Sequence, residues 1–157
     1  MILPAILSLL LLAQAAPAPA PTPEQFFTGR TEGSGSVNVI MSGRHSVRVR
    51  STGRMERGAL LLDQIVQEEG KPARRRSWRL VRSGPDRFTG TLSDARGPVT
   101  GEVAGNVLRL RYRTAEGPSV DQRITLQPGG RTAHNRMTFR RFGLTVATVE
   151  ETIRRVD

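Results

Sequence analysis

The stretch RFTGTLSDARGPVTGEVAGNVLRLRYR, residues 87–113, decides the fold class of this chain. It contains three short runs of alternating residues separated by Gly, Pro, Asp and Asn, which is the pattern of successive antiparallel strands. In the last run Leu108, Leu110 and Tyr112 fall on one face, because side chains alternate along a strand, and the arginines between them fall on the other. The stretch therefore predicts an all-β protein.

Similar runs recur along most of the 157 residues. We predict strands at residues 37–41, 46–52, 59–67, 77–82, 87–92, 99–103, 107–114, 120–127 and 135–142. Turn-forming sequences such as Ser42-Gly43 and Gly105-Asn106 link them. Short links favour pairing between neighbours in the chain, so the sheet is expected to be an antiparallel, up-and-down meander.

One face of this sheet is apolar and must be covered. Its predicted members are Val47, Val49, Leu60, Leu62, Trp78, Leu80, Phe88, Leu92, Val103, Leu108, Leu110, Tyr112, Ile124, Leu126, Met137 and Phe139. A sheet of eight to nine strands covers such a face by closing on itself or by folding into two layers. We expect a closed barrel, which at this size holds either packed side chains or one small ligand.

The two ends of the chain need separate interpretations. Residues 2–13 are almost wholly apolar, and small residues at Ala13 and Ala15 suit a signal peptidase, so we expect a signal peptide over 1–15 and export to the periplasm. A retained membrane anchor is the competing interpretation. A Pro/Ala-rich spacer over 16–23 and a barrel domain over 24–157 follow. A helical turn is expected near residues 23–27, capped by Thr22, in which Phe26 or Phe27 plugs an opening.

Residues 144–156 carry a helical capping pattern but are rich in β-branched residues, and we predict a strand.

The amino-acid composition limits the kinds of partner that this protein is expected to bind. The net charge is +10, all but one of the basic residues is Arg, and there is no cysteine, which removes disulfides and thiol chemistry. Scattered arginines can simply solvate outer strand faces, or they can attract an anionic membrane surface. Nucleic acid is not expected, because few aromatic residues accompany the arginines.

Four groups of residues carry a resemblance to a known family. They are Phe26-Phe27-Thr28-Gly29, Trp78 after an Arg cluster, Ser93-Asp94 with Gly97, Gly101, Gly105-Asn106 and Tyr112, and Asn135-Arg136-Met137 with Arg141-Phe142-Gly143. From about Phe26 onward the chain resembles domain-of-unknown-function family 3833, which consists of proteobacterial envelope proteins, many of them lipoproteins. The resemblance implies an envelope location and a calycin-like (lipocalin-like) β-barrel, and it supplies no chemistry.

This chain departs from that family at two places. It lacks the lipobox cysteine, which argues against a lipid anchor. It also has Asp121-Gln122-Arg123 where the family is expected to carry an acidic residue followed by tryptophan.

No catalytic or metal-binding constellation stands out. The two histidines, His45 and His134, have no carboxylate at metal-ligand spacing, and no nucleophile-elbow spacing supports a Ser-His-Asp arrangement with Asp94. We therefore predict a protein that is not an enzyme and that uses no metal or cofactor.

The predicted function is binding of a small apolar or amphipathic molecule, such as a lipid with a fatty acyl chain, inside the barrel. The residues expected to line the site are Trp78, Leu80, Phe88, Gly90, Gly101, Leu110, Tyr112, Met137 and Phe139. Asp94, Asn135 and Arg136 are expected to pair across the mouth of the barrel. The alternative is a solid barrel that docks on anionic envelope surfaces through exposed arginines.

Overall fold

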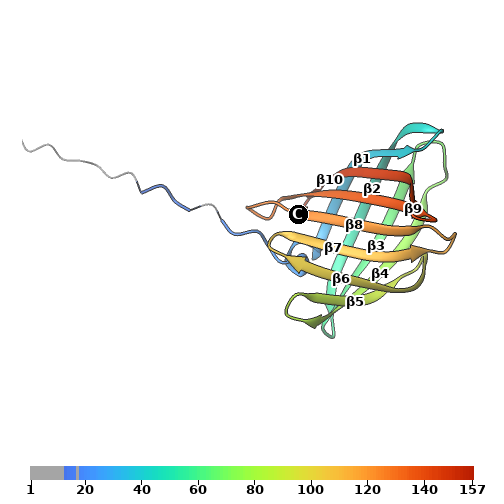
Figure 1. Cartoon of the computed structure of the whole chain (residues 1–157). Coiled ribbons are helices and arrows are strands. Elements are labelled where there is room, and N and C mark those ends of the chain that lie inside the picture. The colour runs from blue at the N-terminus through green and yellow to red at the C-terminus, as the bar shows by residue number, and fades with distance from the viewer. Residues whose placement is uncertain (1–12, 17) are drawn as a thin grey trace, which may run out of the picture.

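The strands of this protein close into one antiparallel barrel (Figure 1). The structure, a computed structural model, describes residues 13–16 and 18–157. Over these residues there are one short helix and ten strands. They are α1 (Pro23–Phe27), β1 (Gly29–Val39), β2 (Gly43–Glu56), β3 (Ala59–Glu68), β4 (Arg74–Gly84), β5 (Arg87–Leu92), β6 (Ala95–Ala104), β7 (Val107–Thr114), β8 (Ser119–Leu126), β9 (Thr132–Arg141) and β10 (Leu144–Arg155).

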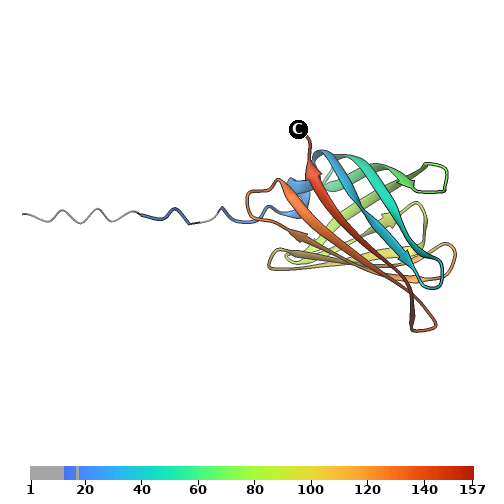
Figure 2. The same cartoon turned by 90° about the horizontal axis from the view of Figure 1, so that it is seen from above.

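The predicted fold class is confirmed, with ten strands instead of eight to nine. Each strand pairs with its neighbours in the chain, and β1 also pairs with β10 from Thr31↔Arg155 to Val39↔Ala147. Figure 2 shows how the strands wrap round a common interior. Because every strand has two partners, the barrel leaves no open sheet edge along its circumference.

Strand β10 accounts for the tenth strand, and β1 is longer than predicted. Residues 33–35, which precede the strand predicted at 37–41, lie inside β1, where Gly33 and Gly35 pair with Val49 and Val47 of β2. The backbone ladder needs no side chains on β1, so its run of Gly and Ser still forms a strand between two well-formed neighbours. Residues 144–155 form β10, as predicted from their β-branched composition.

The period-two pattern places the apolar face inside. Almost all the residues predicted for this face are buried, and Val103 and Phe139 are half-buried at its margin. The charged residues between them point outward, as Arg48 and Arg50 do on β2. Burial of this face is the main source of stability for a chain without disulfides.

Helix α1 plugs one end of the barrel, as the sequence predicted. Thr22 and Gln25 form a reciprocal capping box with hydrogen bonds of 2.9 and 3.2 Å. The helix carries Phe26 and Phe27, which are buried with ring centroids 4.9 Å apart in an edge-to-face arrangement. Two hydrogen bonds of 2.9 Å between Arg82 of β4 and Glu24 of α1 fasten the plug to the wall.

The predicted signal peptide lies almost wholly outside the described residues. Residues 13–16 have no regular secondary structure, and residues 18–22 lead to α1 at the barrel, where Ala20 packs against the core (Figure 1). In the part of the chain that the structure covers, no helix has the length and apolarity needed to span a membrane.

Candidate functional site

The interior of the barrel is filled at the α1 end and hollow at the opposite end. At that opposite end, which we call the mouth, a cavity of about 480 Å³ opens between the hairpins that follow β1, β3, β7 and β9. Its apolar wall consists of Val37, Val39, Val47, Val49, Val66, Tyr112, Met137, Phe139, Val146, Ala147 and Val149. A completely solid barrel, the alternative considered from the sequence, is therefore wrong at the mouth.

Charged residues at the margin of this cavity are paired with each other. Glu68 accepts from Lys71 at 3.1 Å and is hydrogen-bonded to His45 at 2.5 Å, and Arg74 donates to Asp94 at 2.5 Å. These pairs link strand ends and loops around the mouth. Their charges are largely compensated.

Below the apolar wall, β4 brings Arg76 and Trp78 onto a polar floor. The Oε1 atom of Gln64, on the adjacent strand β3, accepts hydrogen bonds from Arg76 Nε and from Trp78 Nε1, each 2.7 Å long. The Nε2 atom of Gln64 in turn donates to Ser51 Oγ at 2.9 Å. This network fixes the direction of the Arg76 guanidinium.

Arg76 is a cation without an ion-pair partner. No carboxylate of the described residues lies within 4.0 Å of its guanidinium nitrogens. Its Cζ atom lies 5.6 Å from the centroid of the Trp78 ring, which packs edge-on against Tyr112 with centroids 5.6 Å apart. Burial raises the pKa of Tyr112 to about 12, so its hydroxyl keeps its proton at neutral pH.

Glu151 of β10 also faces this floor. Its side chain lines both the mouth cavity and a smaller inner cavity of about 30 Å³. Burial raises the pKa of Glu151, and the Arg76 charge and a hydrogen bond from Asn135 only partly oppose this effect. Glu151 is thus an interior carboxyl group that holds its proton more tightly than an exposed one does.

The inner cavity contains an unpaired acceptor. Gln122 and Asn135 are 4% and 5% exposed, and Gln122 Nε2 donates to Asn135 Oδ1 at 3.1 Å. The Oε1 atom of Gln122 is buried and accepts no hydrogen bond from the residues that the structure describes. A buried polar atom without a partner is costly, and this one is available to a donor that enters the barrel.

The residues predicted to line the site fall into three groups. Tyr112, Met137 and Phe139 line the mouth cavity, and Trp78, Leu80 and Leu110 line the inner one. Phe88, Gly90 and Gly101 line neither, because protein atoms already occupy the space beside them. A Cβ atom on Gly90 would lie 1.8 Å from the carbonyl oxygen of Arg79, and one on Gly101 would lie 3.0 Å from a methyl group of Leu110.

The polar residues predicted to pair across the mouth do not meet. Asp94 binds Arg74 at the mouth, Asn135 is buried beside Gln122, and Arg136 lies on the outer surface 3.3 Å from Glu150. Adjacent residues of a strand point to opposite faces, so Asn135 and Arg136 could not both reach the interior. His134 is exposed on the outside as well, and the Ser-His-Asp arrangement does not form.

Sequence reasoning missed Gln64, Arg76, Gln122 and Glu151. Gln64, Gln122 and Glu151 each lie between two apolar inward residues, as Gln122 does between Val120 and Ile124. A polar residue that interrupts such a period-two apolar run is the signal that would have identified these three. Arg76 follows the inward Arg74, so it carries no such signal.

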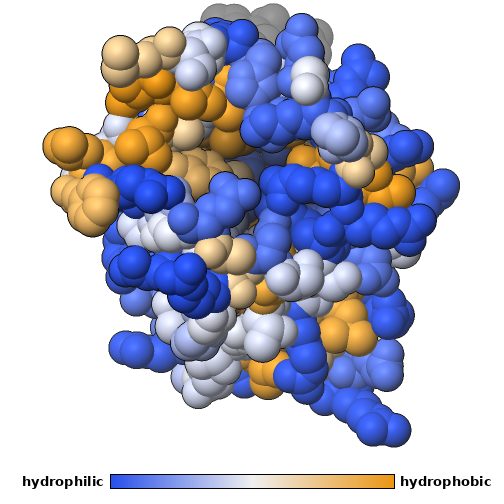
Figure 3. Space-filling model, turned by 90° about the vertical axis from the view of Figure 1, so that its right-hand side faces the viewer, coloured by the Kyte–Doolittle hydropathy of each residue, from blue (hydrophilic) through white to orange (hydrophobic). Residues whose placement is uncertain are grey.

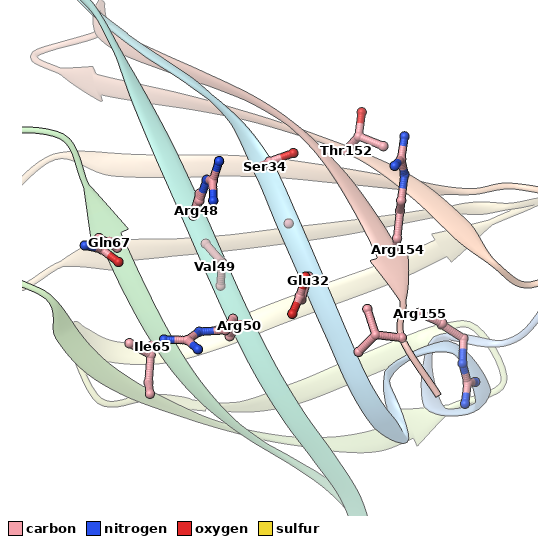
Figure 4. Close-up of a pocket in the computed structure, with 12 residues that line it drawn as sticks. Glu32, Ser34, Arg48, Val49, Arg50, Ile65, Gln67, Thr152, Arg154 and Arg155 are labelled. Atoms are coloured by element: carbon pink, nitrogen blue, oxygen red, sulfur yellow. The ribbon is translucent and has the colours of Figure 1, made fainter.

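A second hollow lies on the outer surface of the barrel. This groove of about 700 Å³ follows β1, whose outward Ser34 is short, between long side chains such as Arg48 of β2 and Arg154 of β10 (Figure 4). The register places Glu32 of β1 between Arg154 and Arg50. The groove is open to solvent, and its floor is the backbone of β1.

The fold and the interior site define a calycin-like barrel with a cup at one end. Such an interior is compatible with binding of a small molecule. The family model described as "Protein of unknown function (DUF3833)" matches residues 5–155, and the chain belongs to this family. The resemblance inferred from the sequence is thus confirmed. No curated protein matches the chain.

A solved structure confirms the barrel type. The S-type phycobiliprotein lyase CPES from Guillardia theta is similar with a TM-score of 0.65 over 85% of this chain and 90% of that chain, at 7% sequence identity. At this identity the likeness shows the fold alone. It also corrects the prediction that this protein is not an enzyme, because a protein named as a lyase uses the same fold. The missing catalytic motif is no ground for excluding catalysis.

Proposed function

We propose that this protein binds a small amphipathic molecule end-on in the mouth cavity, with the anionic group of the molecule at Arg76 and its apolar part against the valine-rich wall. The observation that carries this proposal is a cation without an ion-pair partner at the bottom of an apolar cup. Because this cation lies below the apolar wall, the molecule enters with its head group first.

The cavity suits such a molecule in size and lining. Its volume of about 480 Å³ lies within the range of small-molecule pockets, about 300–1,000 Å³. The wall offers branched and aromatic side chains to an acyl or similar apolar chain, and the paired charges around the mouth do not compete for the head group.

The floor suits an anionic head group. Gln64 holds Nε of Arg76, which leaves the two terminal nitrogens of the guanidinium for a bidentate contact with a carboxylate. Since burial raises the pKa of Glu151, this neighbour is a poor counterion and a good hydrogen-bond donor when protonated. A bound carboxylate would supply the missing negative charge and would lower the cost of placing Arg76 inside the barrel.

We also infer that the protein works after export, in the periplasm. The apolar residues 2–13 and the small residues at Ala13 and Ala15 support this location. Cell fractionation followed by N-terminal sequencing tests it: a periplasmic protein that begins at Ala16 supports export with cleavage, and an intact N-terminus in the cytoplasm contradicts it.

A fluorescent fatty acid tests the binding proposal. We would titrate the purified protein with dansylaminoundecanoic acid and, separately, with its uncharged methyl ester. We expect the acid to bind and Arg76→Gln to weaken its binding by about tenfold or more, because hydrogen bonds to a charged group contribute about 1.5–3 kcal/mol. Binding of the ester should change little in this variant.

Two matched variants control this experiment. Arg79 lies on the same strand and points outward, so Arg79→Gln should bind the acid like the unmodified protein. Ala147→Trp places a large ring in the mouth and should block both ligands. The proposal fails if neither ligand binds, if Ala147→Trp binds normally while folded, or if Arg76→Gln and Arg79→Gln behave alike.

A further inference from the structure

Four large apolar side chains point into solvent at the mouth of the barrel. Ile40 and Met41 at the tip of the β1–β2 hairpin are 55% and 100% exposed, and Phe142 and Leu144 at the tip of the β9–β10 hairpin are 95% and 72% exposed. We call these four residues the rim patch. Figure 3 looks onto this end of the molecule and shows apolar surface gathered at its upper left.

The two hairpin tips lie side by side and form one surface. Strands β1 and β10 pair up to Val39↔Ala147, and beyond this pair Ile40 N donates to the Val146 carbonyl at 3.0 Å. Val39, Val146 and Ala147 line the mouth cavity. The rim patch is therefore continuous with the apolar wall of the proposed binding site.

Two of these exposed residues also have an uncommon backbone conformation. Met41 and Phe142 have φ angles of 68° and 52°, a left-handed conformation that favours Gly and Asn and is strained for bulky residues. Phe142 and Gly143 form the two-residue turn of their hairpin, and Arg57 and Gly58 form the same turn between β2 and β3 at the α1 end. The first residue of this turn is the charged Arg57 at the plugged end and the aromatic Phe142 at the mouth.

The charge around the rim patch is positive. Residues 40–44 and 140–144 include Arg44, Arg140 and Arg141 and no acidic residue. None of these three arginines forms an ion pair within the described part of the chain. Exposed apolar side chains next to unpaired arginines complement a bilayer with anionic head groups, because the apolar groups enter the interface while the arginines stay with the phosphates.

We propose that the rim patch docks the barrel, mouth first, on an anionic lipid bilayer. In this orientation the mouth cavity faces the lipid, and an amphipathic molecule can pass between the membrane and the barrel. The docking itself does not depend on a ligand in the cavity.

Sedimentation with lipid vesicles tests this proposal. The full chain is mixed with vesicles of phosphatidylglycerol and phosphatidylcholine, and with vesicles of phosphatidylcholine alone. We expect binding to the anionic vesicles, and we expect Met41→Asn/Phe142→Asn to reduce it by about tenfold or more, because two apolar side chains no longer enter the interface. Asn suits a left-handed backbone better than Met or Phe, so the variant should be as thermally stable as the unmodified protein or more stable.

Matched variants distinguish docking through the rim patch from other causes of vesicle binding. Arg57→Asn makes the same kind of change at the plugged end and should leave vesicle binding unchanged. Arg44→Gln/Arg140→Gln should weaken binding to anionic vesicles only. Because all variants keep the same N-terminal residues, a contribution of that segment cancels in the comparison.

The outcomes that overturn the proposal are distinct from failure of the ligand site. Equal vesicle binding by the unmodified protein and Met41→Asn/Phe142→Asn, or no binding by either, overturns it. Sedimentation equilibrium without lipid covers the remaining alternative: self-association that disappears in the same variant would assign the rim patch to a second copy of the chain. The Arg76→Gln protein should dock normally even though it binds the fatty acid more weakly.

Discussion

Gly33 on β1 leaves the space that the carboxyl group of Glu151 on β10 occupies. A Cβ atom on Gly33 would lie 2.0 Å from Glu151 Oε1 and 2.6 Å from its Cδ. Both residues are on strands that pair with each other, and both face the interior. The absence of a side chain at Gly33 therefore makes room for the Glu151 carboxyl group on the polar floor of the barrel.

Gly33→Ala should destabilise the protein by about 1–3 kcal/mol, because Glu151 must leave its position or the strands must move apart. Glu151→Ala in the same chain should recover most of this loss. The measurement is a double-mutant cycle by denaturant unfolding. Additive effects of the two substitutions would show that the two side chains do not compete for space.

Glu151→Gln should stabilise the protein more at neutral and alkaline pH than at acidic pH. The folded-state pKa of Glu151 lies above its ordinary value because of burial, so the folded protein binds more protons than the unfolded chain between the two pKa values. Stability from this group is therefore full below the unfolded pKa and is lost as the pH rises through the folded pKa. Thermal melts of both proteins across this range check the sign, and parallel curves would contradict it.

Asp121→Asn should lower stability at neutral pH and have little effect in strong acid. Hydrogen bonds from Arg109 across β7 and β8 hold the pKa of Asp121 below its ordinary value. The stabilisation is present above the unfolded pKa and is lost as the pH falls through the lower folded one. Melts of the single variants and of Asp121→Asn/Arg109→Gln identify the pair: the second substitution should cost little once the first is made.

Phe26→Ala should destabilise the barrel by about 3–5 kcal/mol, since this side chain is fully buried in the plugged end. Gln25→Ala removes only one hydrogen bond of the capping box and should cost about 1 kcal/mol. Denaturant midpoints compare the two variants. Equal costs would mean that α1 contributes through its cap and not through its aromatic side chains.

The sequence was informative wherever apolar and polar residues alternate. Leu108, Leu110 and Tyr112 lie inside as their spacing requires, and the aromatic plug with its Thr22 cap could also be predicted from local rules. The start of β1 could not be predicted from the sequence, because Gly33 and Gly35 lack the side chains that mark a strand. Their conformation is imposed by pairing with β2 and β10, which no local pattern reveals.

The polar floor of the barrel depends on contacts between strands that are distant in the sequence. Arg76 comes from β4, Gln122 from β8 and Glu151 from β10, and only closure of the barrel brings them to one cavity. Gly90 and Gly101 were expected to line the site, but the Arg79 backbone and the Leu110 side chain occupy the space beside them, which a sequence does not show.

The barrel closes only when its last strand, β10, pairs with its first strand, β1. Earlier strands can pair as they are synthesised, yet both backbone edges stay unsatisfied until β10 arrives, and contacts between such distant segments form slowly. Removal of β10 would therefore leave β1 and β9 as open strand edges.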